Sequence, residues 1–66
     1  MYNVGEKVLV IDGNPHREGI VEKASTWGEV NGIKGETSPC YFVRVQSWDN
    51  DTNGGRWIGE IHLRKI

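Results

Sequence analysis

One stretch of the sequence carries oxygen ligands at the spacing of a calcium-binding loop. Residues 49–60 read DNDTNGGRWIGE, which fits the pattern D-x-[DN]-x-[DN]-G-x5-E at every specified position. The candidate metal ligands are Asp49, Asp51, Asn53 and Glu60. Carboxylate and amide oxygens at this spacing surround Ca²⁺ in an EF-hand. Calcium binding is therefore the first hypothesis that the residues raise.

The segments around this loop do not fit an EF-hand. A helix on each side holds such a loop, but residues 41–48 read YFVRVQSW, which predicts a strand. Arg56 occupies the usual apolar pairing position, and no second loop is present. Asn, Asp and Gly are also typical of polar hairpin turns, because they form local hydrogen bonds and adopt positive φ. We therefore interpret residues 49–55 as a hairpin turn and expect no bound metal or cofactor.

Residues suited to catalysis are few, and the sequence does not group them. His16 and His62 fall in separate predicted turns, and the single cysteine, Cys40, has no base at a motif spacing. So short a chain also leaves little room for a substrate cavity. The sequence thus argues against an enzyme. A lone cysteine excludes an intrachain disulfide and fits a reducing compartment.

Length and charge narrow the choice of partners. The 66 residues are enough for one domain, which we expect to span 1–66. Eight basic and nine acidic residues give a net charge of −1, unlike the strongly basic surface of a dedicated nucleic-acid binder. No apolar run approaches the roughly 20 residues that cross a membrane, and the first residues do not read as a signal segment. We expect a cytoplasmic protein that does not associate with membranes.

Aromatic and arginine side chains are the best candidates for binding a partner. The chain has six aromatic residues, three of them tryptophans, and Trp, Tyr and Arg are common anchors of protein interfaces. These aromatic side chains either pack on the core or form a partly exposed binding surface; the sequence leaves both interpretations open. The candidate partner-binding residues are Trp57, Phe42, Trp48, Trp27, Arg44 and Arg56.

Nucleic acid is the alternative partner. Basic side chains beside aromatic faces can hold a single strand, and the candidates are Lys34, Arg44, Arg56, Arg64 and Lys65. Asp49, Asp51 and Glu60 lie in the same half of the chain and would repel phosphate. The charge balance therefore favours a protein partner over nucleic acid.

Short β-type segments alternate with turns along the whole chain. The predicted strands are 7–11, 19–23, 41–45, 56–58 and 63–66, with a tight helical turn at 59–62. Asn31-Gly32 between two β-branched residues predicts the two-residue turn of a small β-ribbon over 27–35. Alternation along the strands assigns a core of Val8, Val10, Val21, Val43, Val45, Ile58 and Leu63. It turns Leu9, Ile11, Ile20, Phe42 and Trp57 to the opposite faces.

The order of these segments resembles a known superfamily. The opening VGEKVLVIDG followed by REGIVEK, and the close RWIGEIHLRKI, are similar to the first and last strands of SH3-like barrels of the KOW, Tudor and photosystem-subunit type. The resemblance implies an all-β, five-stranded SH3-like barrel with a β-ribbon insertion between the second and third strands and a short helical turn before the last. On such a fold we expect a non-enzymatic binding module, as in small accessory or regulatory proteins of bacteria and phages, with a protein partner or a second copy of this chain. The resemblance to KOW domains implies nucleic acid as the alternative partner.

Overall fold

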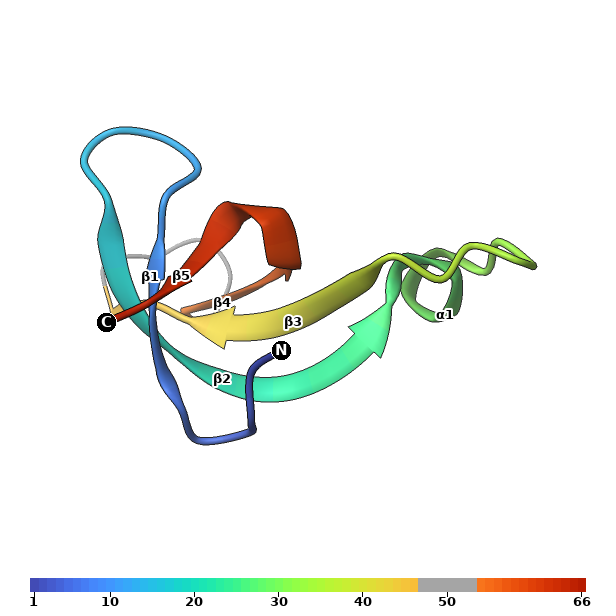
Figure 1. The fold of residues 1–66 in the computed structure, drawn as a ribbon, viewed down its shortest axis with the longest axis horizontal. Helices are drawn as coiled ribbons and strands as arrows, with labels where there is room; N and C mark the ends of the chain where they lie inside the picture. Colours follow the sequence, from blue (N-terminus) through green and yellow to red (C-terminus); the bar gives the residue numbers. More distant parts are fainter. Residues whose placement is uncertain (47–53) are drawn as a thin grey trace.

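The computed structural model, which describes residues 1–46 and 54–66, has one antiparallel five-stranded sheet as its main feature (Figure 1). The strands are β1 (Lys7–Val10), β2 (Arg17–Thr26), β3 (Pro39–Arg44), β4 (Gly55–Gly59) and β5 (Leu63–Lys65). Their order in the sheet is β4-β3-β2-β1-β5, so β4 and β5 are its two edges. Helix in the described residues is limited to a short α1 (Trp27–Asn31) and a 3₁₀ turn, η2 (Glu60–His62). The predicted all-β class is confirmed.

The core lies on one face of the strands and follows the predicted alternation. Each of the seven side chains assigned to the core from the sequence is buried, from Val8 and Val43 at 0 % exposure to Ile58 at 8 %. Tyr41 joins this cluster, and Tyr2 packs against it. Every second residue of a strand points to the same face. The alternation of apolar residues in the sequence was therefore enough to identify the core.

β2 is longer than the sequence indicates and belongs to two strand pairs. It pairs with β1 over Arg17–Ile20 and with β3 over Ile20–Thr26. The register shifts between Val21 and Lys23, so that one extra residue stands opposite β3. Such a bulge increases the bend and twist of a strand. The predicted bounds of 19–23 are therefore too short at both ends, because only the central part of β2 has the apolar pattern of a strand.

The predicted hairpin turn at Asn31-Gly32 is wrong. Thr26 caps the start of α1, where its Oγ1 accepts a hydrogen bond from the Glu29 N–H at 3.2 Å. Gly32 ends the helix in the left-handed conformation, with φ of 69°, and its N–H bonds to the Gly28 carbonyl. A Gly after the last helical residue serves this role as readily as it serves a hairpin. α1 and the loop after it therefore replace the predicted β-ribbon, at the end of the molecule far from the C-terminus (Figure 1).

The predicted helical turn before the last strand is present as η2. The segment ahead of β1 packs nearby: the Tyr2 hydroxyl donates to the Leu63 carbonyl at 3.1 Å, and the Tyr2 N–H donates to the Tyr41 hydroxyl at 3.2 Å. Tyr41 in turn donates to Oε2 of Glu60 at 2.8 Å. This chain of hydrogen bonds connects the first residues, β3 and η2. Neither helical segment of the described residues has the length and apolar character needed to cross a membrane.

Candidate binding site

Phe42 and Trp57 lie side by side on the face of the sheet that is turned away from the core. They stand opposite each other in the β3–β4 register, and their rings meet edge to face with centroids 5.5 Å apart. Both side chains are partly buried, and neither belongs to the core cluster. Their flanking neighbours Tyr41, Val43 and Ile58 occupy the core instead. The outward orientation predicted from alternation is therefore confirmed, and both rings are partly buried rather than part of the core cluster.

Two glycines lie beside aromatic rings along the outer face of β4, and one of them, Gly55, leaves space that a Cβ would fill. Gly55 and Gly59 stand on either side of Trp57 at the period of a strand. A Cβ at Gly55 would overlap the Phe42 ring, and one at Gly59 would lie 3.4 Å from Nε1 of Trp27. Phe42 thus covers one glycine and Trp27 approaches the other. We call Phe42, Trp57 and Trp27 the aromatic row.

The bulge in β2 adds charge beside this row. Lys23 stands opposite Phe42, and its Nζ lies 5.4 Å from the centre of the Phe42 ring, which is a cation–π distance. The residue before it, Glu22, accepts two hydrogen bonds from Arg44, from Nε at 2.7 Å and Nη2 at 3.0 Å. The hydrogen bonds from Arg44 lower the pKa of the Glu22 carboxyl. Two consecutive charged residues therefore reach the same face, because the bulge interrupts the alternation.

A groove of about 310 Å³ runs along the free edge of β4. Four consecutive residues of β4, 56–59, line it. Alternate residues of a strand point to opposite faces, so a hollow that touches four in a row lies along the strand's edge, and β3 occupies the other edge. The remaining wall comes from the end of β1, the start of α1 and η2; its residues are Val10, Asp12, Trp27 and His62. We call this hollow the edge groove.

The backbone of Trp57 faces the edge groove. The Val45 N–H bonds to the Gly54 carbonyl, which makes this pair the first hydrogen-bonded pair of the ladder. Hydrogen-bonded and non-hydrogen-bonded pairs alternate in an antiparallel ladder. Phe42 and Trp57, three positions further, are therefore a non-hydrogen-bonded pair. The N–H and C=O of Trp57 point away from β3 toward the groove, and within the described residues no other backbone group bonds to them.

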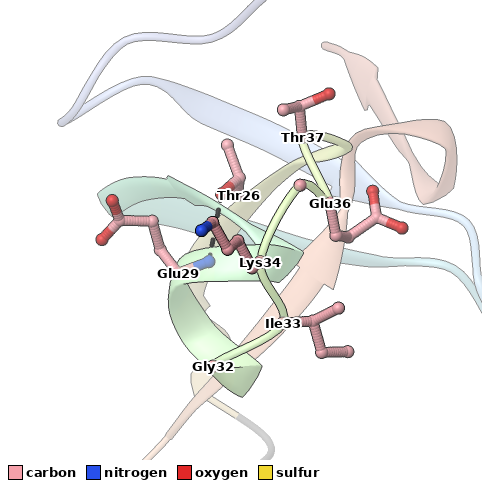
Figure 2. Close-up of a pocket in the computed structure, with 9 residues that line it drawn as sticks. Thr26, Glu29, Gly32, Ile33, Lys34, Glu36 and Thr37 are labelled. Carbon is pink, nitrogen blue, oxygen red and sulfur yellow. Dashed lines mark hydrogen bonds between the residues drawn. The ribbon is translucent and has the colours of Figure 1, made fainter.

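A larger hollow, of about 530 Å³, lies beside α1 (Figure 2). It is formed by α1 and the loop after it, and its lining includes Thr26, Glu29, Lys34 and Glu36. Figure 2 shows the Thr26–Glu29 capping bond among the lining residues, with Ile33 and Glu36 directed away from it. Hydrogen bonding by the Ser38 side chain lowers the pKa of the Glu36 carboxyl, and the bond that Glu36 accepts from the Ser38 N–H at 2.8 Å acts in the same direction. The polar groups here serve the local structure, and none of the aromatic side chains that the structure describes lines the hollow.

The basic candidates for nucleic-acid binding do not gather on one face. Lys34 lies in the loop after α1, whereas Arg64 and Lys65 belong to β5, the edge strand at the opposite end of the sheet order from β4. Arg64 donates to the carbonyl of Leu63 at 2.9 Å. Arg44 is bound to Glu22, as described above. Arg56 lies opposite Val43, on the other face of β4 from Trp57.

Three of the four candidate calcium ligands, Asp49, Asp51 and Asn53, lie outside the described residues. The aromatic candidate Trp48 also lies outside them. The fourth candidate ligand, Glu60, is hydrogen-bonded to the Tyr41 hydroxyl. In the part of the chain that the structure describes, no three His, Cys, Asp or Glu side chains are grouped so as to hold a metal ion. Cys40 is fully buried, and burial raises the pKa of its thiol, which disfavours the reactive thiolate.

Four residues around the row and the groove were missed from the sequence: Lys23, Asp12, Gly55 and Gly59. Lys23 reaches the outer face because of the bulge, and no residue type at 21–23 predicts a bulge there. Gly55 was assigned to the predicted hairpin turn 49–55, and Gly59 to the predicted helical turn 59–62. The spacing Gly-x-Trp-x-Gly is the one signal that was available, since glycine within a strand marks a site where another group approaches closely.

Comparisons of the chain with protein-family models, with curated proteins and with solved structures give no significant match.

Proposed function

We propose that the sheet closes into an SH3-like barrel. Three features support the proposal: the strand order β4-β3-β2-β1-β5, the bulged β2 shared by two strand pairs, and η2 joining the two edge strands. A long strand that bends at a bulge can pair at its two ends with differently oriented strands. The hydrogen bonds of Tyr2 to Leu63 and Tyr41 add a connection between the edge strand β5 and β3, the neighbour of the other edge strand.

On this barrel we infer a non-enzymatic binding module for a protein partner. The observation that carries the proposal is the aromatic row: Phe42 and Trp57 are held on the outer face, away from the core, by a strand whose other outer positions are glycine. Small proteins rarely expose neighbouring aromatic rings without an interaction that uses them. The buried, unpaired Cys40 agrees with a reducing compartment such as the cytoplasm.

A single-stranded nucleic acid is the second candidate, because the Lys23–Phe42 contact puts a positive charge beside a ring on which a base could stack. The dispersed positions of the other basic residues make it the weaker one.

Affinity capture from the native host, with and without nuclease, tests the proposal. We expect nuclease-resistant recovery of a specific protein, and Trp57→Ala should weaken its binding by about 2 kcal/mol or more, the scale of an interface hot spot. Ile33→Ala is the matched control, because Ile33 is an exposed apolar residue of the loop after α1, at 54 % exposure, and does not line the edge groove. Circular dichroism must show that both variants remain folded.

Loss of every partner on nuclease treatment would instead favour nucleic acid. If Trp57→Ala unfolds the protein, Phe42→Leu, which keeps an apolar side chain over Gly55, takes its place in the same assay. Equal recovery with wild type, Phe42→Leu and Ile33→Ala would contradict a role for the aromatic row. Sedimentation of the wild type, compared with the same variants, tests whether the bound protein is a second copy of this chain.

A further inference from the structure

The edge groove has the features of a site for an extended peptide. On one side lies the edge of β4 that pairs with no other strand of the described residues, with the N–H and C=O of Trp57 directed into the groove. An extended segment that lies against such an edge gains backbone hydrogen bonds as a further strand, while its alternate side chains enter neighbouring pockets. The wall opposite, from the end of β1 and from η2, leaves a hollow rather than a paired strand.

The other side of the groove shows which side chain fits. Two indoles, Trp27 and Trp57, line it together with the carboxylate of Asp12. Within the described residues Asp12 forms no hydrogen bond or ion pair. Tryptophan is the ring that attracts a cation most strongly, and an unpaired carboxylate beside it adds direct attraction. A lysine or arginine side chain could place its aliphatic stem along the indoles and its charged group at Asp12.

Asp12 is held at the Gly59 end of the groove. The N–H of Ile11, its neighbour, bonds to the His62 carbonyl at 2.9 Å. The His62 ring lies near the outer side of Gly59, where a Cβ would be 3.8 Å from it. Arg56 lines the groove at the other end of β4, three residues or roughly 10 Å away along the strand. The groove is therefore polarised, with its acidic group at the end where Trp27 stands.

We propose that the edge groove binds an extended peptide segment of a protein partner as a sixth strand beside β4, with one basic side chain seated between the indoles and Asp12. This inference rests on the proposed function and names the chemistry that the partner presents. The segment pairs with the N–H and C=O of Trp57, and its basic residue lies at the Gly59 end of the strand.

Binding of matched peptides tests the proposal. The probes are acetyl-Thr-Val-Lys-Val-Thr-amide, the same peptide with norleucine or glutamate in place of lysine, and the lysine peptide methylated at its central backbone nitrogens. Tryptophan fluorescence of the full chain reports binding. We expect the lysine peptide to bind about tenfold more tightly than the norleucine peptide. Backbone methylation should weaken binding by at least a similar factor, because it removes the strand hydrogen bonds.

Asp12→Asn separates the contribution of the Asp12 charge to binding from that of the shape of the groove. We expect this variant to bind the lysine and norleucine peptides equally, with the affinity for norleucine unchanged. Glu29→Gln is the control, because Glu29 is an exposed carboxylate of α1 that does not line the groove, and it should keep the tenfold preference. A preference that survives Asp12→Asn, equal binding of the glutamate peptide, indifference to methylation, or no binding of any peptide at millimolar concentration would each overturn the proposal.

The same variants separate this inference from the proposed function. If a captured protein partner is lost with Trp57→Ala but retained with Asp12→Asn, the aromatic row binds the partner and the basic-peptide proposal is wrong. If the partner is lost with both, the two proposals stand together.

Discussion

Gly55 and Phe42 form the contact that most directly tests how the aromatic row is held. A Cβ at Gly55 would overlap the Phe42 ring, so Gly55→Ala should lower the free energy of unfolding by about 1–3 kcal/mol, the usual cost of overpacking. The cause is steric and depends on the ring. In a Phe42→Ala background the same change should therefore cost almost nothing, as denaturant titration of the four proteins of this cycle would show. Equal costs in both backgrounds would mean that the ring is not held against Gly55.

Tyr41 and Cys40 predict how stability changes in alkali. Burial raises the pKa of the Tyr41 hydroxyl, and its hydrogen bond to Glu60 acts in the same direction; burial also raises the pKa of the Cys40 thiol. For both groups the folded state favours the neutral form. Their contribution is therefore complete below the unfolded-state pKa values, about 8.5 for Cys and about 10 for Tyr, and is lost as the pH rises through the higher folded-state values.

We expect the free energy of unfolding to fall with pH above this range. Cys40→Ala should flatten the part of the curve that begins near pH 8.5, and Tyr41→Phe the part that begins near pH 10. Urea unfolding at a series of pH values measures both slopes. The slope of the free energy of unfolding against pH is the quantity to compare. The absolute free energy is not, since each variant also loses packing or a hydrogen bond. Slopes identical to that of the wild type would show that these groups do not titrate differently on unfolding.

At the scale of elements, α1 makes opposite predictions for two adjacent residues. Gly32 has φ of 69°, so Gly32→Ala should destabilise the protein by about 1–2 kcal/mol. Asn31 is the last helical residue, and Asn31→Ala should be neutral or slightly stabilising, because alanine is the better helix former. A type I′ hairpin would require positive φ at both positions. Thermal unfolding in which Asn31→Ala is also clearly destabilising would therefore support the hairpin against the helix.

The sequence predicted the strands and core well because alternation is a local property. Val8, Val21 and Val43 could be assigned to the core without knowing which strands pair. The prediction for residues 26–32 was wrong because Asn31-Gly32 is compatible with both a hairpin turn and a helix end. The capping pair of Thr26 with Glu29, three residues on, was the signal that favours the helix. The bulge could not be predicted, since it depends on pairing with β3.

The binding site was only partly predictable, for a reason that lies in the whole molecule. The Phe42–Trp57 pair follows from alternation within β3 and β4. Asp12 and Trp27 join the edge groove because β1 ends beside η2 and α1 begins beside Gly59, and both are tertiary contacts between segments far apart in the chain. The sequence therefore indicated the rings but not the groove that they line.

The behaviour of the whole molecule with calcium tests whether residues 49–60 bind this ion. Glu60, the first residue of η2, is hydrogen-bonded to the Tyr41 hydroxyl. The sequence around the loop predicts no EF-hand helices. We therefore expect millimolar calcium to leave the melting temperature nearly unchanged, whereas tight binding to the native state would raise it by mass action. Differential scanning calorimetry with calcium and with magnesium gives the comparison. A rise specific to calcium that Asp49→Ala abolishes would contradict this expectation.

The pairing of β1 with β5 has a mechanical consequence. Val8 stands opposite Lys65 and Val10 opposite Leu63, so the beginning of one strand lies beside the end of the other. A pulling force applied to the chain before β1 and after β5 would load the Lys65 end of this ladder first. The hydrogen bonds would then break one after another, as in a zipper, rather than all together in shear. The sheet should therefore open under a small force by peeling away β5, while β2, β3 and β4 keep their pairing and the aromatic row stays intact.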